Sequence, residues 1–219
     1  MKNIQLPIAL DEKILSRVSG EMPVAIHQFS ESLGNAIDAK DHHTSSHSEE
    51  VAEIAKMIAL EMRLSKRVAE IIHVAGHLHD IGKIGIPDSV LQKNGALNDE
   101  EWRLVREHPA KGAEIIYPVE ALRDLGIVKM VRHHHERYDG CGYPDGLKGK
   151  SIPLGARVIT LADSLSAMTQ DRPYRAGCSF VEAKNEIVRC CGRQFDPCVV
   201  RAFWHCADEV DKLIAKMKR

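Results

Sequence analysis

A histidine and an aspartate stand side by side where a predicted helix ends, within the stretch His77–Asp88 (HLHDIGKIGIPD). Upstream, apolar residues recur at helical spacing and predict a helix with one buried face; they are Val68, Ile71, Ile72, Ala75 and Leu78. Two glycines and a proline after Asp80 stop this helix and turn the chain. Lys83 is then one turn from Asp80 and able to reach an anion bound there. Alone, such a pair is more often a helix cap and a solvated charge than a pair of metal ligands. Metal binding is therefore inferred only if other parts of the chain supply further ligands.

The histidines are unevenly distributed, because ten of the twelve lie between His42 and His135. Histidines scattered through a core would not cluster in this way, whereas metal ligation needs many neutral imidazoles in one domain. The six cysteines lie mostly in the C-terminal third and have no CxxC spacing. We therefore expect reduced thiols rather than a disulfide framework or a zinc knuckle.

Composition excludes several classes of protein. The 219 residues suffice for one domain with a substantial core. With 30 basic and 31 acidic residues the net charge is -1, so no overall field attracts nucleic acid or an anionic membrane. No stretch approaches the roughly 18 uninterrupted apolar residues of a membrane span, and the N-terminus does not look like a secretion signal. We expect a soluble cytoplasmic protein without a nucleic-acid or membrane partner. Aromatic residues make up only 5% and alternating β-branched runs are missing, which favours an all-α fold.

Capping patterns and apolar spacing place the helices. Residues 1–20 carry no interpretable motif and are expected to be a tail of unknown role. Predicted helices cover 22–40, a segment after Ser46, the segment that leads to Asp80, a segment from Asn98 to His108, another behind Pro109, 120–132, a segment from Leu154, one after Ser179 and the C-terminal residues from Pro197. Ser46 with Glu49, Asn98 with Glu101 and Ser179 with Glu182 are each expected to cap the start of a helix. The buried stripe behind Ser46 contains Val51, Ile54, Ile58 and Met62. His47 lies on this stripe, where a buried imidazole needs a partner. That partner is either a metal or, as for an ordinary core histidine, a hydrogen-bond acceptor.

The segment 136–153 is predicted to be a loop, because it is rich in glycine and proline. Gly142 lets the backbone approach a ligand, and Tyr143 offers a flat face for a nucleobase. A Gly-Tyr-Pro turn that merely connects helices is the alternative. Asp163 lies in the apolar stripe of the next helix, where a carboxylate is costly unless it is paired or bound to a cation.

Seven nitrogen and oxygen donors are thus spread over at least five predicted helices; they are His47, His79, Asp80, His108, His134, His135 and Asp163. A helical bundle can bring such residues together, and a carboxylate such as Asp80 can bridge two metals about 3.5 to 4 Å apart. Without thiolates in the set, iron or manganese is expected, with zinc or nickel as substitutes in a purified sample.

Five sequence blocks resemble the HD-GYP domain, a subgroup of the HD phosphohydrolases that hydrolyse cyclic di-GMP. They are HDIGKIGIPD at 79–88, LQKNGALNDEE at 91–101, HPAKG at 108–112, HHERYDGCGYPDG at 134–146, and RVITLAD with DRPYR between 157 and 175. The blocks follow one another in the family's order between residues 79 and 175. The resemblance implies an HD-superfamily helical bundle, here residues 21–219, with a di- or trinuclear metal site whose ligands match the seven donors.

The resemblance implies a role for Lys83, and the expected reaction suggests roles for further residues. Lys83 matches the family's phosphate-binding lysine, and Asp41 is expected to orient a water or a proton. Tyr143 and Gly142 are expected to contact substrate, together with Arg172 and Arg175, which would reach the base or the phosphate.

The chain also departs from the family's pattern. His43 stands where trinuclear members have a glutamate ligand, so it either binds a third metal or faces solvent. Leu165 and Ser166 replace an aromatic residue and an acid, which affects the expected substrate preference and rate. His77 and His133 are additional to the motif and are expected near the metal ligands or at the surface.

The expected reaction is in-line attack of a metal-bridging hydroxide on one phosphodiester of cyclic di-GMP, which gives pGpG and then GMP. Two alternatives stay open: hydrolysis of another cyclic dinucleotide or nucleotide, and a module that binds nucleotide without turnover. The expected partners besides the nucleotide are a second copy of the chain or a signalling protein, since HD-GYP domains commonly follow a receiver or a sensor.

Overall fold

The protein is built from helices. The structure is a computed structural model that describes residues 24–41, 46–93, 95–171 and 176–217. Its elements are α2 (Val24–Lys40), α3 (His47–Glu61), α4 (Lys66–Leu78), η1 (Ile81–Gly85), α5 (Asp88–Leu91), α6 (Asp99–Arg106), α7 (His108–Ile116), α8 (Glu120–Asp124), α9 (Ile127–Arg132), η2 (Gly149–Ser151), α10 (Leu154–Thr169), α11 (Phe180–Arg189) and α12 (Pro197–Met217). Within these ranges the only β-structure is an isolated bridge between Cys191 and Phe195. The predicted all-α class is confirmed.

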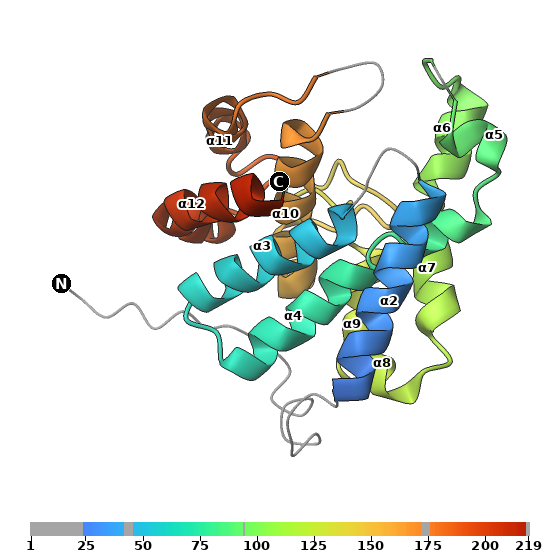
Figure 1. Ribbon diagram of the computed structural model, residues 1–219, viewed down its shortest axis with the longest axis horizontal. Coiled ribbons are helices and arrows are strands. Elements are labelled where there is room, and N and C mark those ends of the chain that lie inside the picture. The colour runs from blue at the N-terminus through green and yellow to red at the C-terminus, as the bar shows by residue number, and fades with distance from the viewer. Residues whose placement is uncertain (1–23, 42–45, 94, 172–175, 218–219) are drawn as a thin grey trace.

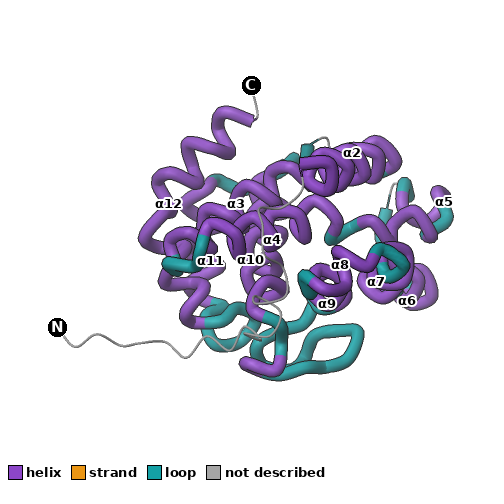
Figure 2. Tube along the Cα trace, turned by 90° about the horizontal axis from the view of Figure 1, so that it is seen from below, coloured by secondary structure: helices purple, strands orange, loops and turns teal. Residues whose placement is uncertain are grey.

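Helices α2, α3 and α4 pack beside one another, and α10 crosses behind α3 and also contacts α4 (Figure 1). Helices α11 and α12 lie at one end of this group, and α5 to α9 lie at the other end in both views (Figures 1 and 2). Helix α4 packs against α9 and leads into η1, which packs against α7. The His-Asp pair of the sequence lies at the junction of α4 and η1.

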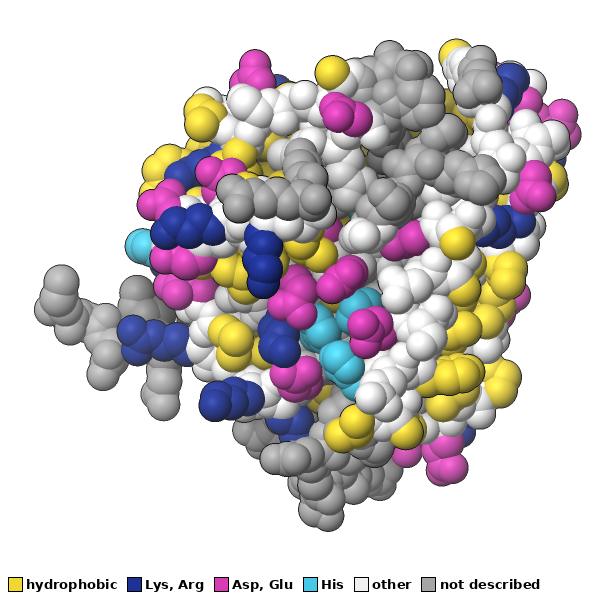
Figure 3. Space-filling view, viewed as in Figure 1, with side chains coloured by type: hydrophobic (Ala, Val, Ile, Leu, Met, Phe, Trp, Pro, Cys, Tyr) yellow, Lys and Arg dark blue, Asp and Glu magenta, His cyan; other side chains and the backbone are white. Residues whose placement is uncertain are grey.

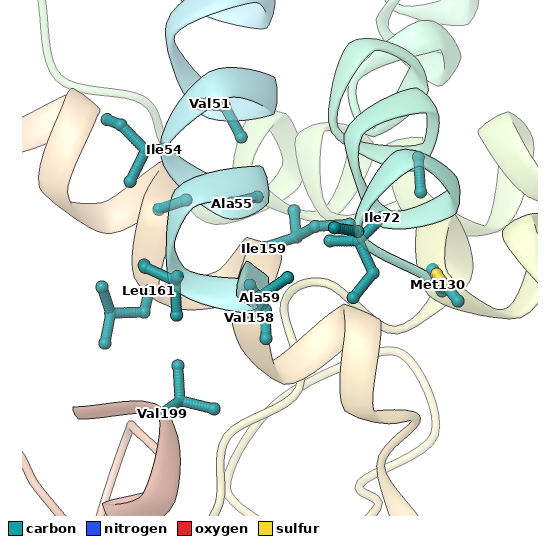
Figure 4. Packing of buried hydrophobic residues seen from close by; sticks show 14 of the residues in the cluster. Val51, Ile54, Ala55, Ala59, Ile72, Met130, Val158, Ile159, Leu161 and Val199 are labelled. Carbon is teal, nitrogen blue, oxygen red and sulfur yellow. The ribbon is translucent and has the colours of Figure 1, made fainter. Parts of the chain in front are cut away.

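The core is formed mainly between α3, α4, α10 and α12 (Figure 4). Val51, Ile54 and Ile58 are fully buried on α3, as the sequence predicts, and Met62 packs at the edge of the cluster. Burial of each such side chain stabilises the fold by roughly 1.5–3 kcal/mol. Small residues bring α3 and α4 close together, since a Cβ on Gly76 would lie 2.7 Å from the Cα of Ala52. This close packing holds the end of α4 in place.

Two predicted capping boxes are confirmed, and the third is wrong. Asn98 with Glu101 starts α6, and Ser179 with Glu182 starts α11. Ser46 makes no side-chain cap, because its backbone is left-handed (φ 65°), whereas a capping residue is normally extended. The Asp38 carboxylate on α2 instead accepts hydrogen bonds from the backbone N–H (2.9 Å) and the hydroxyl (2.8 Å) of Ser48.

Two predicted helix boundaries also differ. The single helix over 120–132 is divided into α8 and α9, because Gly126 adopts a left-handed conformation (φ 74°) that ends the first segment. Helix α6 ends at Arg106 rather than at His108, which instead begins α7. Pro109 follows in the first turn of α7, where a missing backbone N–H costs nothing.

Among the described helices, none has both the length and the apolar character needed to cross a membrane. All six cysteines are free thiols, as expected. The predicted tail, residues 1–20, lies outside the described residues.

Candidate metal centre

Asp80 lies at the junction between α4 and η1, and its two carboxylate oxygens face different imidazoles. Oδ1 lies 3.1 Å from Nε2 of His108. Oδ2 lies 3.3 Å from Nε2 of His79 and 3.9 Å from Nε2 of His47. The side chain is almost fully buried. Asp80 therefore stands between two groups of nitrogen donors, as a bridging ligand would.

The first group contains His47 at the start of α3, His79 at the end of α4, and Asp80. One donor atom of each lies within 4.8 Å of the others. Asp163 joins them from α10, with Oδ1 at 3.2 Å from Nε2 of His47 and 4.0 Å from Nε2 of His79. Both predicted carboxylate ligands thus converge on the same two imidazoles.

The second group contains His108, His134 and His135, whose donor atoms also lie within 4.8 Å of one another. His108 begins α7, and the other two follow the end of α9. Nε2 of His108 lies 3.2 Å from Nε2 of His134. The structure therefore brings together all seven predicted ligands around Asp80, in two groups.

Three of the imidazoles are oriented by their own backbone. In His79, His108 and His134, Nδ1–H donates to a carbonyl oxygen three residues earlier, at 2.7 Å each. A carbonyl oxygen can only accept, so the proton of each neutral ring lies on Nδ1 and a lone pair is left on Nε2. This is the tautomer that a metal-ligating histidine usually adopts.

These lone pairs call for a cation. When the His79 ring is neutral, the lone pair on its Nε2 is buried and has no hydrogen-bond donor among the described residues. The Nε2 lone pairs of His108 and His134 face each other across 3.2 Å, which is unfavourable unless a proton or a metal lies between them. Two nitrogens bound to one tetrahedral metal at 2.0–2.1 Å would be about 3.3 Å apart. The donor set therefore fits metal ions.

The carboxylates of the centre are held in their charged form. Burial alone would raise the pKa of Asp80, but His79 and Lys83 outweigh it and hold the pKa well below its ordinary value. Burial likewise opposes the charge on Asp163, but the hydrogen bond from His47 and the nearby His79 lower its pKa. Both side chains are thus available as anionic ligands.

Three imidazoles of the centre have strongly shifted pKa values. Burial lowers the pKa of His134, and burial with the neighbouring His108 lowers that of His135 to about 3. Burial opposes the protonation of His79 too, but the charges of Asp80 and Asp163 outweigh it and raise its pKa to about 9. At neutral pH, His134 and His135 are therefore ready to ligate, whereas His79 must first lose a proton.

Lys83 and Asp41 lie beside Asp80. The Lys83 ammonium is 2.7 Å from Oδ2 of Asp80 and 2.9 Å from Oδ2 of Asp41. Burial works against its charge, but the two carboxylates outweigh burial and raise its pKa. The two residues that the sequence nominates for catalysis thus lie at the candidate centre.

A pocket of about 630 Å³ opens above the metal-ligand candidates. Its wall includes Asp80, Asp163, His135, Lys83, Asp41 and Tyr143. In Figure 3, histidine side chains lie in a hollow on one face, bordered by acidic and basic side chains. Tyr143 stacks on His135 with 5.0 Å between the ring centroids. The volume lies within the roughly 300–1,000 Å³ typical of small-molecule sites.

Two further residues near the pocket were not singled out from the sequence. Trp102 on α6 also lines the pocket and is half-exposed. The Arg106 guanidinium lies 5.7 Å from the centroid of the Tyr143 ring. A tryptophan four residues after a capping asparagine, with an arginine one turn further, was a sequence feature that could have identified this face of α6.

Several other predicted residues are placed differently or lie outside the described residues. A Cβ on Gly142 would lie 2.3 Å from the backbone nitrogen of Arg137, so this glycine is explained by packing within its own loop. His133 is bound to the Lys129 carbonyl and to Asp145. The predictions for His43, Arg172 and Arg175 concern residues outside the described ranges.

Ser166 stands where the resemblance predicts an acid. Its hydroxyl is hydrogen-bonded to Nδ1 of His47 at 2.9 Å, and it is not part of the pocket wall, to which Ala167 belongs. Ser166 therefore contacts a candidate metal ligand.

The chain matches the family model described as HD domain over residues 31–199. It therefore belongs to the HD domain family, and its recognition as an HD-GYP member is confirmed by relatives named cyclic di-GMP phosphodiesterases. One of these is the cyclic di-GMP phosphodiesterase response regulator RpfG of Xanthomonas campestris pv. campestris. It is 37% identical over 199 residues, which are 90% of this chain and 52% of the relative.

A second relative, the 3'3'-cGAMP-specific phosphodiesterase 3 of Vibrio cholerae, is 40% identical over 144 residues, which are 66% of this chain and 31% of the relative. Among solved structures, a cyclic GMP-AMP specific phosphodiesterase from V. cholerae shares the fold with a TM-score of 0.64 and 19% identity. The match covers 87% of this chain and 49% of that one. The chain thus spans about half, or less, of the length of each of these proteins.

Proposed function

We propose that this chain is a metal-dependent phosphodiesterase that hydrolyses cyclic di-GMP to linear pGpG and then to GMP. One observation carries the proposal: two groups of nitrogen and oxygen donors meet at the two oxygens of Asp80, at the base of a pocket. The relative from X. campestris, named a cyclic di-GMP phosphodiesterase, supports the choice of substrate.

The proposed centre holds two divalent ions. His47, His79, Asp163 and Oδ2 of Asp80 would hold one, and His108, His134, His135 and Oδ1 of Asp80 the other. Iron or manganese suits this set of imidazoles and carboxylates, with zinc or nickel as substitutes. When bound, such ions lower the pKa of a shared water and neutralise phosphoryl oxygens. A third ion at His43 stays a prediction, because that residue lies outside the described ranges.

Lys83 supplies a fixed positive charge next to the proposed reaction site. Its raised pKa keeps it protonated at neutral pH, so it acts by stabilising negative charge on phosphorus oxygens rather than by transferring a proton. Asp41 holds the ammonium in place through the 2.9 Å ion pair and is the nearest carboxylate, after Asp80, that could orient a water.

Tyr143 is proposed to stack on a guanine. Its ring forms part of the pocket wall, with His135 stacked on it and the Arg106 guanidinium 5.7 Å from its centroid, so a base that enters the pocket could stack against the ring if the Arg106 side chain moves aside. Burial, and then the charges of Asp163 and Asp80, raise the pKa of its hydroxyl, which stays protonated. Contacts from Arg172 and Arg175 to the base or phosphate remain predictions.

The test uses protein prepared without oxygen, with its metals counted and with nucleotide products separated by chromatography. Asp80→Asn is expected to lower the hydrolysis of cyclic di-GMP at least about 10²–10³-fold, because it removes the carboxylate that both donor groups share. Its far-ultraviolet circular dichroism should stay helical. The control is Asp88→Asn, an aspartate of the same motif whose side chain is exposed and pairs with Lys40. Full activity in Asp80→Asn would contradict the proposal.

A second candidate substrate is 3'3'-cGAMP, because the relative from V. cholerae is named as specific for it. The same protein, given both cyclic dinucleotides in parallel, distinguishes the two by kcat/KM. Tight nucleotide binding without turnover, in protein with two ions per chain, would instead support a binding module and exclude both enzymatic functions.

A further inference from the structure

A second cluster of histidines lies between α2 and α4 and shares no residue with the Asp80 centre. It consists of His27, His73 and His77, and one donor atom of each lies within 4.8 Å of the others. The ring centroids are 4.9 Å apart for His27 and His73, and 4.7 Å apart for His73 and His77. The proposed function makes no use of these three rings.

Local structure explains why the rings meet. His73 and His77 are four residues apart on α4, so they lie one above the other on the same face of the helix. His27 comes from α2, which packs against this face. The contact is close, since a Cβ on Gly34 of α2 would lie 2.8 Å from the carbonyl oxygen of His77.

Glu53 on α3 orients the middle ring. Its carboxylate oxygen Oε1 lies 2.9 Å from Nε2 of His73 and can only accept, so Nε2 carries the proton. The lone pair on Nδ1 of His73 then points to Nε2 of His27, 2.9 Å away. A carboxylate that accepts from one ring nitrogen and so leaves the lone pair on the other is the usual outer support of a metal-binding histidine; here that lone pair accepts from His27 until an ion takes its place.

The third ring provides an independent observation. His77 is only 3% exposed, and its Nδ1 has no hydrogen-bond partner among the described residues. The chain of hydrogen bonds from His27 through His73 to Glu53 satisfies the first two rings and leaves this nitrogen unpaired. A buried polar atom without a partner is costly unless something else binds it.

We propose that His27, His73 and His77 bind one divalent transition-metal ion of the zinc, nickel, cobalt or copper class, at a site separate from the Asp80 centre. Three imidazoles around one such ion are about 3.3 Å apart, a short approach from the spacing in this structure. Donors that are all imidazoles suit these ions, whereas carboxylates dominate sites for harder ions. His27 is only partly buried and the Glu53 side chain is 37% exposed, so an ion can reach the site from solvent.

The ion would join α2 to α4 through residues 46 positions apart in the sequence. Helix α4 leads directly to His79 and Asp80, and α2 leads to Asp41. The site therefore ties together the two helices that deliver Asp80 and Asp41 to the proposed catalytic centre.

The test counts zinc. Full-length wild type and His27→Gln are stripped of metal, dialysed against the same excess of Zn²⁺ and analysed by inductively coupled plasma mass spectrometry. His27 is the most accessible of the three, so its replacement leaves the buried rings in place. We expect His27→Gln to hold one zinc fewer per chain than the wild type. His205→Gln removes an exposed histidine on α12 and should keep the wild-type count.

A second variant tests the supporting carboxylate. Glu53→Gln should weaken zinc binding at this site by roughly 10- to 100-fold and leave the other bound zinc unchanged in a competition titration with a chromophoric chelator. Circular dichroism checks the folding of each variant. Equal zinc counts in wild type and folded His27→Gln would overturn the proposal, and so would an unchanged affinity in Glu53→Gln.

Discussion

Lys83 is a buried positive charge beside the candidate centre, and its expected contribution to catalysis can be tested against that of a surface lysine. Its ammonium lies between the carboxylates of Asp80 and Asp41, and all three side chains are shielded from solvent. Lys40 forms an ion pair of the same length, 2.7 Å, with Asp88, but that aspartate side chain is 66% exposed. The two lysines therefore make a matched comparison between a buried position beside the candidate centre and a surface position.

Replacing Lys83 by methionine should lower kcat for the cyclic dinucleotide by about 10²–10³-fold, because a fixed charge that stabilises the transition state is lost. The metal content, measured by mass spectrometry, should stay the same, since Lys83 is not a ligand. Lys40→Met should change kcat less than twofold and stability by about 0.5 kcal/mol or less. A kcat within twofold of wild type in Lys83→Met would contradict the proposed role.

The raised pKa of His79 predicts that metal binding depends on pH. Its pKa of about 9 in the metal-free protein means that the ring is protonated below that pH, and a metal must displace the proton. Apparent metal affinity should therefore rise with pH, by up to roughly tenfold per unit, and level off near pH 9.

Calorimetric titration with Mn²⁺ at pH 7, in two buffers with different heats of ionisation, measures the protons released. We expect about one proton per chain from His79, because His134 and His135 have lowered pKa values and are already neutral. Binding without proton release would show that the ring is neutral before the metal arrives.

At the scale of elements, the packing of η1 against α7 decides where His108 lies. A Cβ on Gly82 would lie 1.9 Å from the carbonyl oxygen of His108 and 2.5 Å from the nitrogen of Gly112. Only glycine allows these two backbones to approach so closely. Gly85 belongs to the same short helix, but a Cβ there would meet only the flexible Lys111 side chain, at 3.2 Å.

Gly82→Ala should therefore push α7 away, lower the free energy of unfolding by about 1–3 kcal/mol and weaken metal binding through the displaced His108. Gly85→Ala should change stability by about 0.5 kcal/mol or less. Urea unfolding and metal titration of the two variants check both effects. Equal behaviour of the two alanine variants would mean that η1 does not position α7.

The starts of helices could be predicted where the capping residues lie within one turn, as at Asn98 and Ser179. The predicted cap at Ser46 was wrong because Asp38, on the preceding helix, accepts the hydrogen bond from the backbone N–H of Ser48 at the start of α3. The division between α8 and α9 was missed because the left-handed conformation of Gly126 is not specified by the apolar spacing around it. Sequence patterns thus predicted capping partners within the same turn and missed the capping partner on a neighbouring helix.

At the scale of the whole molecule, the candidate centre connects parts of the chain that are far apart in sequence. Its ligands come from the start of α3, the end of α4, the start of α7, the end of α9 and the middle of α10. Metal bound there stabilises the folded state only, because the unfolded chain does not bring these donors together.

Chelation should therefore lower the unfolding temperature without removing the helices. An ion present at 100 times its dissociation constant contributes about 2.7 kcal/mol, and for a chain of this size each kcal/mol corresponds to about 2–4 °C. We expect the midpoint to fall by about 5–10 °C for each ion removed. Circular dichroism at 222 nm, before and after chelation and after Mn²⁺ is restored, measures both quantities. An unchanged midpoint would indicate that no metal is bound under these conditions.

The ligand set could be proposed from the sequence because the motifs mark each donor. The sequence did not show which oxygen of Asp80 faces which imidazole, because that depends on contacts between distant elements. It also placed His77 near the ligands or at the surface, whereas the ring is buried beside His73. The spacing of four residues between these two histidines was visible, but their partner His27 lies on another helix.

The carbonyl groups that accept Nδ1–H from His79, His108 and His134 have a thermodynamic consequence. Each ring is held by a hydrogen bond to its own turn of backbone in the folded protein, so it has lost its rotational entropy before any ion binds. Metal binding therefore costs little further side-chain entropy, and more of the favourable enthalpy of ligation contributes to the affinity.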